Sequence, residues 1–276
     1  MKLPPAIKPP VPPERYDCTI VVNSLEDVEV PPAGTVTIRS ALASTADGEP
    51  IIFDENLDGG VIELSIIGDD HTVLKGEVMR MRNEPSGPVS FLVGYFERDY
   101  RKSALYARKN VVIDASAFPS GITLASTGGY ENPARVLAVY GDLNMINVSI
   151  TGGKSVAEEL PPPDPAGPYG QLSTRAHGAG LAVWDVARLV NCTIYNNHCK
   201  REANIPARSR DAGAFGGGIY ADIVDMEGCV VSGNSVSASG VSGGGVFSVG
   251  GAESDEEVSK IEKSAITGNR TTGIFA

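Results

Sequence analysis

The chain has 276 residues, a formal net charge of −11 and 42% hydrophobic residues. This length allows one domain, and the negative charge argues against a nucleic-acid partner, because phosphate binding needs a basic face. No run approaches the roughly 18 apolar residues of a membrane-spanning helix, and residues 1–13 lack the apolar stretch of a signal peptide. The composition favours a soluble extracellular protein and argues against a membrane span in this chain.

The first 110 residues are irregular. Residues 1–15 are rich in proline and predict an extended, mobile arm. Residues 16–110 are expected to form a cap and the first irregular coils, with short strands at 18–22, 51–53, 61–64 and 89–93. Residues 37–45 predict a short helix with Ile38, Ala41 and Leu42 on one face. Such a helix would cover the open end of stacked strands, whose edges proteins commonly protect.

Residues 111–276 repeat one pattern and are predicted to form regular coils. A glycine-rich segment followed by alternating apolar residues recurs, with marker glycines at Gly218, Gly245 and Gly273 that are 27 and then 28 residues apart. The spacing is about 27 residues, within the range of 20 to 50 that indicates stacked repeats. A second alternating run in each repeat ends in glycine and asparagine, which suit tight corners with positive φ. Each repeat therefore predicts one coil of parallel strands that buries its face against the next coil.

Alternation in the second run predicts which side chains point inward. They are Cys192 and Ile194, Cys229 and Val231, and Ser264 and Ile266. Strands of successive coils lie about 4.8 Å apart, so Cys192 and Cys229 would be within reach of a disulfide. A column of buried free thiols fits the same spacing, and both interpretations stay open.

Three insertions interrupt the coils, at residues 154–178, 198–215 and 250–257. The first two follow the same corner, so their loops should lie on one side and could build a binding surface. The sequence stops just as another repeat starts. Because an open end would expose strand edges, we expect further C-terminal sequence or a partner to cover it.

The repeats GGGIYA at 216–221 and GGGVFS at 243–248 resemble those of bacterial surface proteins with polymorphic-outer-membrane-type repeats, within the pectate-lyase-like superfamily. Residues 36–43, VTIRSALA, resemble a degenerate CSLREA-type motif in which Ser40 replaces the glutamate. This resemblance implies an all-β fold, a right-handed parallel β-helix solenoid with a short N-terminal helical cap. It also implies a secreted or cell-surface protein, and the family carries no single activity.

Asp185 and Asp222 are the best catalytic candidates. They have the same sequence offset as Cys192 and Cys229, so they should stack on adjacent coils, with Asp225 just beyond. Two close carboxylates raise one pKa or recruit a cation. The resemblance implies Ca²⁺-dependent lyases or hydrolases that use paired carboxylates, so Asp185 and Asp222 could hold Ca²⁺, although no cofactor is required. Two aspartates in equivalent solvated turns are the alternative.

A second set of residues suggests glycan binding. Trp184 and Tyr220 could stack on a sugar ring, and a locally basic segment could meet an anionic sugar: it contains Lys200, Arg201, Arg208 and Arg210. Lateral packing of the aromatic residues and a solvated basic loop are the alternatives. The sequence thus supports two functions. One is a non-catalytic, adhesin-like or structural β-helix presenting loops to a glycan or protein; the other is a polysaccharide lyase or glycoside hydrolase acting on acidic glycans.

Overall fold

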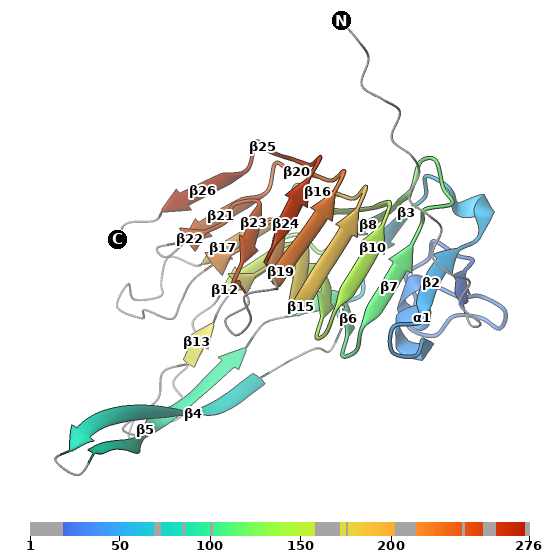
Figure 1. Ribbon diagram of the computed structural model, residues 1–276. Helices are drawn as coiled ribbons and strands as arrows, with labels where there is room; N and C mark the ends of the chain where they lie inside the picture. The colour runs from blue at the N-terminus through green and yellow to red at the C-terminus, as the bar shows by residue number, and fades with distance from the viewer. Residues whose placement is uncertain are drawn as a thin grey trace, which may run out of the picture.

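The computed structural model describes residues 19–68, 73–84, 87–99, 102–157, 172–174, 176–201, 214–238, 241–250 and 258–273. Nearly all regular structure in these ranges is strand, and most strands pair in parallel with a strand from the next repeat (Figure 1). The arrangement is compatible with a β-helix-like fold. The predicted arm at residues 1–15 lies outside the described residues.

Sheet A is the largest sheet and consists of two bands joined by two long strands. The first band contains β1 (Ile20–Val22), β2 (Pro50–Phe53), β7 (Val111–Asp114), β10 (Leu143–Ile146), the second halves of β15 (Leu181–Val190) and β19 (Ile219–Glu227), and β24 (Lys260–Glu262). The second band contains β6 (Ser103–Ala107), β9 (Arg135–Val139), the first halves of β15 and β19, and β23 (Val246–Ser248). Every pairing within sheet A is parallel.

In chain order, the strands of three smaller sheets follow the first band of sheet A and precede the second band. Sheet B contains β3 (Val61–Leu64), β8 (Ile122–Ser126), β11 (Val148–Thr151), β16 (Thr193–Tyr195), β20 (Val230–Ser232) and β25 (Ala265–Thr267). Sheet D contains β12 (Lys154–Ala157), β17 (His198–Arg201), β21 (Ser235–Ala238) and β26 (Arg270–Gly273). Sheet E contains β14 (Ala176–His177), β18 (Ala214–Phe215) and β22 (Val241–Ser242). We call one passage through these sheets a circuit.

One antiparallel hairpin interrupts the first circuits. It is formed by β4 (Val73–Glu84) and β5 (Gly87–Asp99), and β13 (Leu172–Thr174) pairs with the end of β5. Figure 1 shows the hairpin extending away from the parallel sheets. The strand expected at residues 89–93 is part of β5, whereas the length of the hairpin was not anticipated.

The core consists of inward side chains stacked from circuit to circuit. Thr193 pairs with Ser149 on one side and Val230 on the other, so Cys192 and Cys229 are vertical neighbours. Cys192, Ile194, Cys229 and Val231 are at most 1% exposed, as predicted. Ile266 is 44% exposed, because β25 is the last strand of sheet B in the described part of the chain.

Corners with positive φ recur from circuit to circuit, and two of them flank sheet B. The corner between sheets A and B has positive φ at Asn147, Asn191, Gly228 and Lys263, and the corner before sheet D at Gly152, Asn196, Gly233 and Gly268. The predicted corner chemistry is therefore confirmed, since asparagine and glycine tolerate this conformation best. Asn197 and Asn234, which follow this second corner, are fully buried.

The segments interpreted as insertions begin with regular structure. Residues 154–157 form β12 and residues 198–201 form β17, which pair with each other in sheet D. Sequence analysis missed these strands because their outward residues are polar and their buried residues include the small Ser155 and Cys199. Residues 158–171, 202–213 and 251–257 of the three predicted insertions lie outside the described residues.

The predicted helix is α1 (Ile38–Ser44), which buries Ile38, Ala41 and Leu42. Thr37 is its N-cap, and a capping box joins Thr37 to Ser40 in both directions. The Ser40 hydroxyl accepts a hydrogen bond from the Thr37 backbone N–H at 2.9 Å. Ser40 thus makes the return bond that a glutamate makes in the usual capping box.

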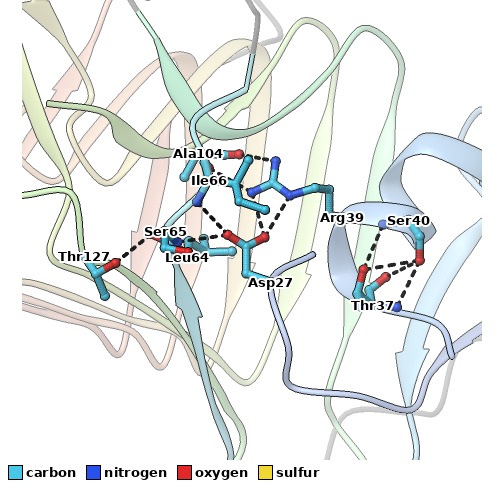
Figure 2. Close-up of polar contacts among 9 residues, drawn as sticks. All are labelled: Asp27, Thr37, Arg39, Ser40, Leu64, Ser65, Ile66, Ala104 and Thr127. Atoms are coloured by element: carbon cyan, nitrogen blue, oxygen red, sulfur yellow. Dashed lines mark hydrogen bonds and ion pairs between the residues drawn. The ribbon is translucent and has the colours of Figure 1, made fainter. Parts of the chain in front are cut away.

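An ion pair between Asp27 and Arg39 ties this helix to the first circuits (Figure 2). Arg39 Nη2 lies 2.7 Å from Asp27 Oδ1, and the two side chains are 17% and 2% exposed. The other Asp27 oxygen accepts the backbone N–H groups of Ser65 and Ile66. Arg39 also donates to the carbonyls of Ala104 and Ile66. One arginine therefore joins α1, the segment after β3 and strand β6.

Replacing Arg39 with methionine is expected to lower the free energy of unfolding by about 3 kcal/mol, because the buried Asp27 carboxylate would lose its cation. Urea unfolding followed by circular dichroism measures the change. The matched control is Arg188→Met, which removes an exposed pair with Asp142 and should cost less than about 1 kcal/mol. Equal losses in both variants would show that the Asp27–Arg39 pair does not anchor the cap.

Candidate functional site

Asp185 and Asp222 lie on adjacent strands, as predicted, but not in simple register. In β15 and β19, Val183 pairs with Ala221 and Val186 pairs with Ile223. Two residues of β15, Trp184 and Asp185, therefore lie opposite Asp222 alone, which is a β-bulge. The difference in residue number between paired positions of β15 and β19 therefore changes by one at the candidate site.

The two carboxylates interact electrostatically. Partial burial and the nearby negative charge of Asp185 raise the pKa of Asp222 above its ordinary value. Asp225 does not join them, since its register partners are Arg188 and Lys260 and its Oδ1 accepts the backbone N–H of Lys260 at 3.2 Å. The structure thus brings together two of the three predicted catalytic residues.

The residues present do not fit a Ca²⁺ site. Calcium takes six to eight oxygen ligands, so several carboxylates must converge on it. Within the described ranges, no group of three or more histidine, cysteine, aspartate or glutamate side chains is placed to hold a metal ion. Asp185 and Asp222 supply only the two carboxylates expected from the sequence.

Replacing Asp222 with asparagine is expected to stabilise the fold at pH 7 by roughly 0.5 kcal/mol, a small effect because the pair is partly exposed and screened. A raised carboxyl pKa in the folded state means that ionisation costs stability as pH rises through that pKa. The gain should therefore vanish at pH values below the ordinary pKa of aspartate. Thermal unfolding across pH measures it. A melting temperature that Ca²⁺ raises in the wild type but not in Asp222→Asn would contradict this interpretation.

Trp184 and Tyr220 belong to a column of aromatic side chains, one from each circuit. Trp184 stacks on Tyr140 with ring centroids 4.4 Å apart, and Tyr220 stacks on Phe247 at 5.7 Å. The ring of His177 stacks on Tyr220 at 4.2 Å. A ring face that contacts another ring is not open to a sugar. The packing alternative therefore accounts for Trp184 and Tyr220 better than sugar stacking does.

Beneath this column lie two buried polar side chains, Arg135 and His177, which are 0% and 2% exposed. The Arg135 guanidinium lies 5.9 Å from the centroid of Trp184, and its Nε donates to the carbonyl of His177. Cation–π and edge contacts of this kind favour a fixed arrangement of rings. The column is best explained as lateral packing on the outside of sheet A.

The outward face of sheet D carries most of the remaining cationic groups near the site. Lys154, His198, Ser235 and Arg270 are register partners on its four strands, and the row beside them contains Lys200 and Ser237. The alternate positions, Ser155, Cys199 and Val236, are buried. We call the six outward residues the sheet D face.

Tyr130 lies beside the sheet D face, on a turn closed by the hydrogen bond from Asn132 N–H to the Gly128 carbonyl. Its side chain is 56% exposed. The Nζ atoms of Lys154 and Lys200 lie 5.1 and 5.7 Å from its ring centroid. Unlike Trp184, Tyr130 makes no ring-to-ring contact within the described residues.

Burial is the main cause of the pKa shifts on the sheet D face. Burial lowers the pKa of Lys154. Burial, and then the charge of Lys154, lower the pKa of His198, whose Nδ1 lies 2.6 Å from Ser235 Oγ. Within the described part of the chain, no carboxylate lies within ion-pair distance of Lys154, Lys200 or Arg270. This cluster of positive charge is local, in a protein of net charge −11.

The predicted basic residues are only partly described. Lys200 is exposed on the sheet D face, and Arg201 ends β17. Arg208 and Arg210 lie outside the described residues. Sequence analysis missed Tyr130 and Lys154, although the alternation Lys-Ser-Val at 154–156 and His-Cys-Lys at 198–200 is a strand signal that could have revealed sheet D.

The cysteine column consists of free thiols rather than a disulfide. Cys192, Cys199 and Cys229 are all buried and unpaired. The backbone N–H of Cys192 lies 3.4 Å from Cys229 Sγ. Burial raises the pKa of Cys192, and it raises that of Cys199 to about 12. These thiols therefore act as small core side chains in this structure.

Comparisons with protein-family models, with curated proteins and with solved structures give no match for this chain. Of the helices in the described ranges, none has the length and apolar character needed to cross a membrane. The assignment of a function therefore rests on the geometry above.

Proposed function

We propose that the chain is a right-handed parallel β-helix, secreted or on a cell surface, that binds a polysaccharide or a protein without transforming it. The observation that carries this proposal is the sheet D face, where cations and hydroxyls recur from circuit to circuit without carboxylate partners in the described residues. A flat row of this kind can contact an extended ligand at several points.

The geometry of the Asp185–Asp222 pair favours a binding protein over an enzyme. A glycosidase or lyase needs an acid, a base and a positioned substrate, and the two-carboxylate mechanisms need both groups to flank the reacting bond. Asp185 and Asp222 repel each other across a bulge, and Asp225 contacts Lys260 instead. The geometry therefore offers no complete set of catalytic groups among the described residues.

Binding and turnover can be measured on the same panel of polysaccharides. The purified chain is incubated with acidic and neutral polymers, with and without Ca²⁺, and both retention and the release of unsaturated products or reducing ends are followed. We expect retention of some polymers and no product. Failure to retain any polysaccharide or surface protein would overturn the proposed function.

The second candidate function is a polysaccharide lyase or glycoside hydrolase acting on acidic glycans. Partial burial and the charge of Asp185 raise the pKa of Asp222, and an upward shift of this kind is what a carboxyl that acts as a general acid requires. Product formation that is abolished in Asp185→Ala and in Asp222→Ala would establish this function. Product formation that persists in both variants would show that the active site lies elsewhere in the protein.

A further inference from the structure

We propose that Tyr130, Lys154 and Lys200 form a binding site for a sugar that carries a carboxylate or sulfate group. This inference rests on the proposed function and assigns it a site and a class of ligand. Lys200 was among the residues expected to meet an anionic sugar, whereas Tyr130 and Lys154 were not, and the aromatic ring of the site is Tyr130 instead of Trp184 or Tyr220.

The geometry of Tyr130 supplies the platform. Its ring is 56% exposed, and the two lysine ammonium groups lie 5.1 and 5.7 Å from the ring centroid. An aromatic ring offers an apolar surface with a polar tip, which suits a ligand that is apolar on one side and polar on the other. A sugar ring has such a shape, with C–H groups on its faces and hydroxyls at its edge. A sugar on Tyr130 would place an acidic substituent near Lys154 and Lys200.

The charge of the site supplies the preference for an anion. Lys154 and Lys200 come from neighbouring strands, and Glu131, the carboxylate next to Tyr130 in the sequence, forms no ion pair with either lysine. Both ammonium groups lie beside the same ring, so an anionic substituent placed near that ring could contact both of them. Because the protein as a whole has a net charge of −11, an anionic polymer is expected to bind only where cations gather locally, as they do here.

The rest of the sheet D face extends the site across the strands. His198, Ser235 and Arg270 continue the row that begins at Lys154, at the strand spacing of about 4.8 Å. This row places an ammonium, an imidazole, a hydroxyl and a guanidinium group on successive strands, and a polymer lying across the strands would meet them in turn. A polysaccharide fits this face better than an acidic peptide, because the exposed tyrosine adds a stacking surface that a carboxylate chain does not need.

The test compares matched polymers and matched variants by surface plasmon resonance. The probes are dextran and dextran sulfate, polygalacturonate, and polyglutamate. The variants are Tyr130→Ala, Lys200→Ala and Lys154→Ala with Lys200→Ala. The control, Lys260→Ala with Lys263→Ala, removes the same charge from sheet A and the adjoining corner. Thermal unfolding confirms that each variant is folded, and the exposed Lys200 and Tyr130 can each be changed without disturbing the core.

We expect dextran sulfate or polygalacturonate to bind and dextran to bind much more weakly. The double lysine variant should lose at least about tenfold in affinity, because two charge contacts are removed. Tyr130→Ala should also lose affinity, Tyr130→Phe should retain it, and the control should match the wild type. If the sulfated and carboxylated polymers bind with different affinities, the polymer that binds more tightly shows which acidic group the site prefers.

Three results would overturn the inference. Unchanged affinity in the double lysine variant would show that the anion binds elsewhere on the protein. Dextran binding as tightly as dextran sulfate would show that no anionic group is needed. Polyglutamate binding as tightly as the anionic polysaccharides, with no effect of Tyr130→Ala, would show that the ligand is an acidic peptide. In each case the protein still binds a partner, so the proposed function survives. Absence of binding to every probe would overturn the inference, and absence of binding to every polysaccharide of the wider panel and to every surface protein would overturn the proposed function as well.

Discussion

Replacing Gly216 with alanine is expected to lower the free energy of unfolding by about 4 kcal/mol, from backbone strain and a direct clash together. Gly216 has φ +61°, and an added Cβ would lie 2.0 Å from the Ile219 carbonyl oxygen. Gly178 and Gly243 have the same conformation and the same close approach one circuit away on either side. The tight passage from sheet E into sheet A therefore has no room for a side chain. Urea unfolding followed by circular dichroism gives the change.

Gly250→Ala separates the two causes. Gly250 has φ +79° but nothing within 4 Å of an added Cβ, so this variant keeps the strain and lacks the clash. Its cost should be about 1–2 kcal/mol, which is the strain of a left-handed alanine. If Gly216→Ala costs no more than Gly250→Ala, the close backbone approach at the glycine cluster is not what requires glycine there.

Replacing Asn234 with alanine is expected to cost about 4 kcal/mol, because buried hydrogen-bonding groups would lose their partners. The Asn234 side chain is fully buried, its Oδ1 accepts the backbone N–H of Asn197 at 3.0 Å, and its Nδ2 donates to the Ile194 carbonyl at 2.9 Å. Asn269 holds the Asn234 backbone N–H in the same way. The asparagines thus form a ladder that satisfies the backbone at one corner of successive circuits. Thermal and urea unfolding measure the loss.

The neighbouring corner residue provides the control. Asn196 is exposed with φ 55°, and glycine occupies the equivalent positions at 152, 233 and 268. Asn196→Gly should therefore change stability by less than about 0.5 kcal/mol. A large loss in Asn196→Gly together with a small loss in Asn234→Ala would show that the corner conformation matters more than the buried ladder.

Repetition in the sequence predicted the stacking of the core correctly. Cys192 and Cys229 share a position in adjacent repeats, and the parallel pairing of Thr193 with Val230 places them one above the other. The prediction succeeded because parallel strands in register carry a side chain to the same position in each circuit. The short helix at residues 38–44 followed from its apolar face and its capping residues in the same way.

The same reasoning was less accurate at the candidate site. Asp185 and Asp222 share the offset of the cysteines, yet β15 has one extra residue there, and the bulge places Trp184 and Asp185 together against Asp222. A bulge is a local choice of the backbone that no spacing reveals. Of the two interpretations left open for Trp184 and Tyr220, the ring contacts favour lateral packing over sugar stacking.

The sequence by itself determined which residues repeat, which side chains face inward and where the backbone must turn with positive φ. These features depend on neighbours along the chain and on a constant period. Only the tertiary structure decided which outward residues meet. Tyr130 precedes sheet D in the chain, whereas Lys154 and Lys200 come from two later circuits, and their contact exists only because the strands of successive circuits align. A surface built across circuits has no signature in a single repeat, since each circuit contributes one or two side chains to it.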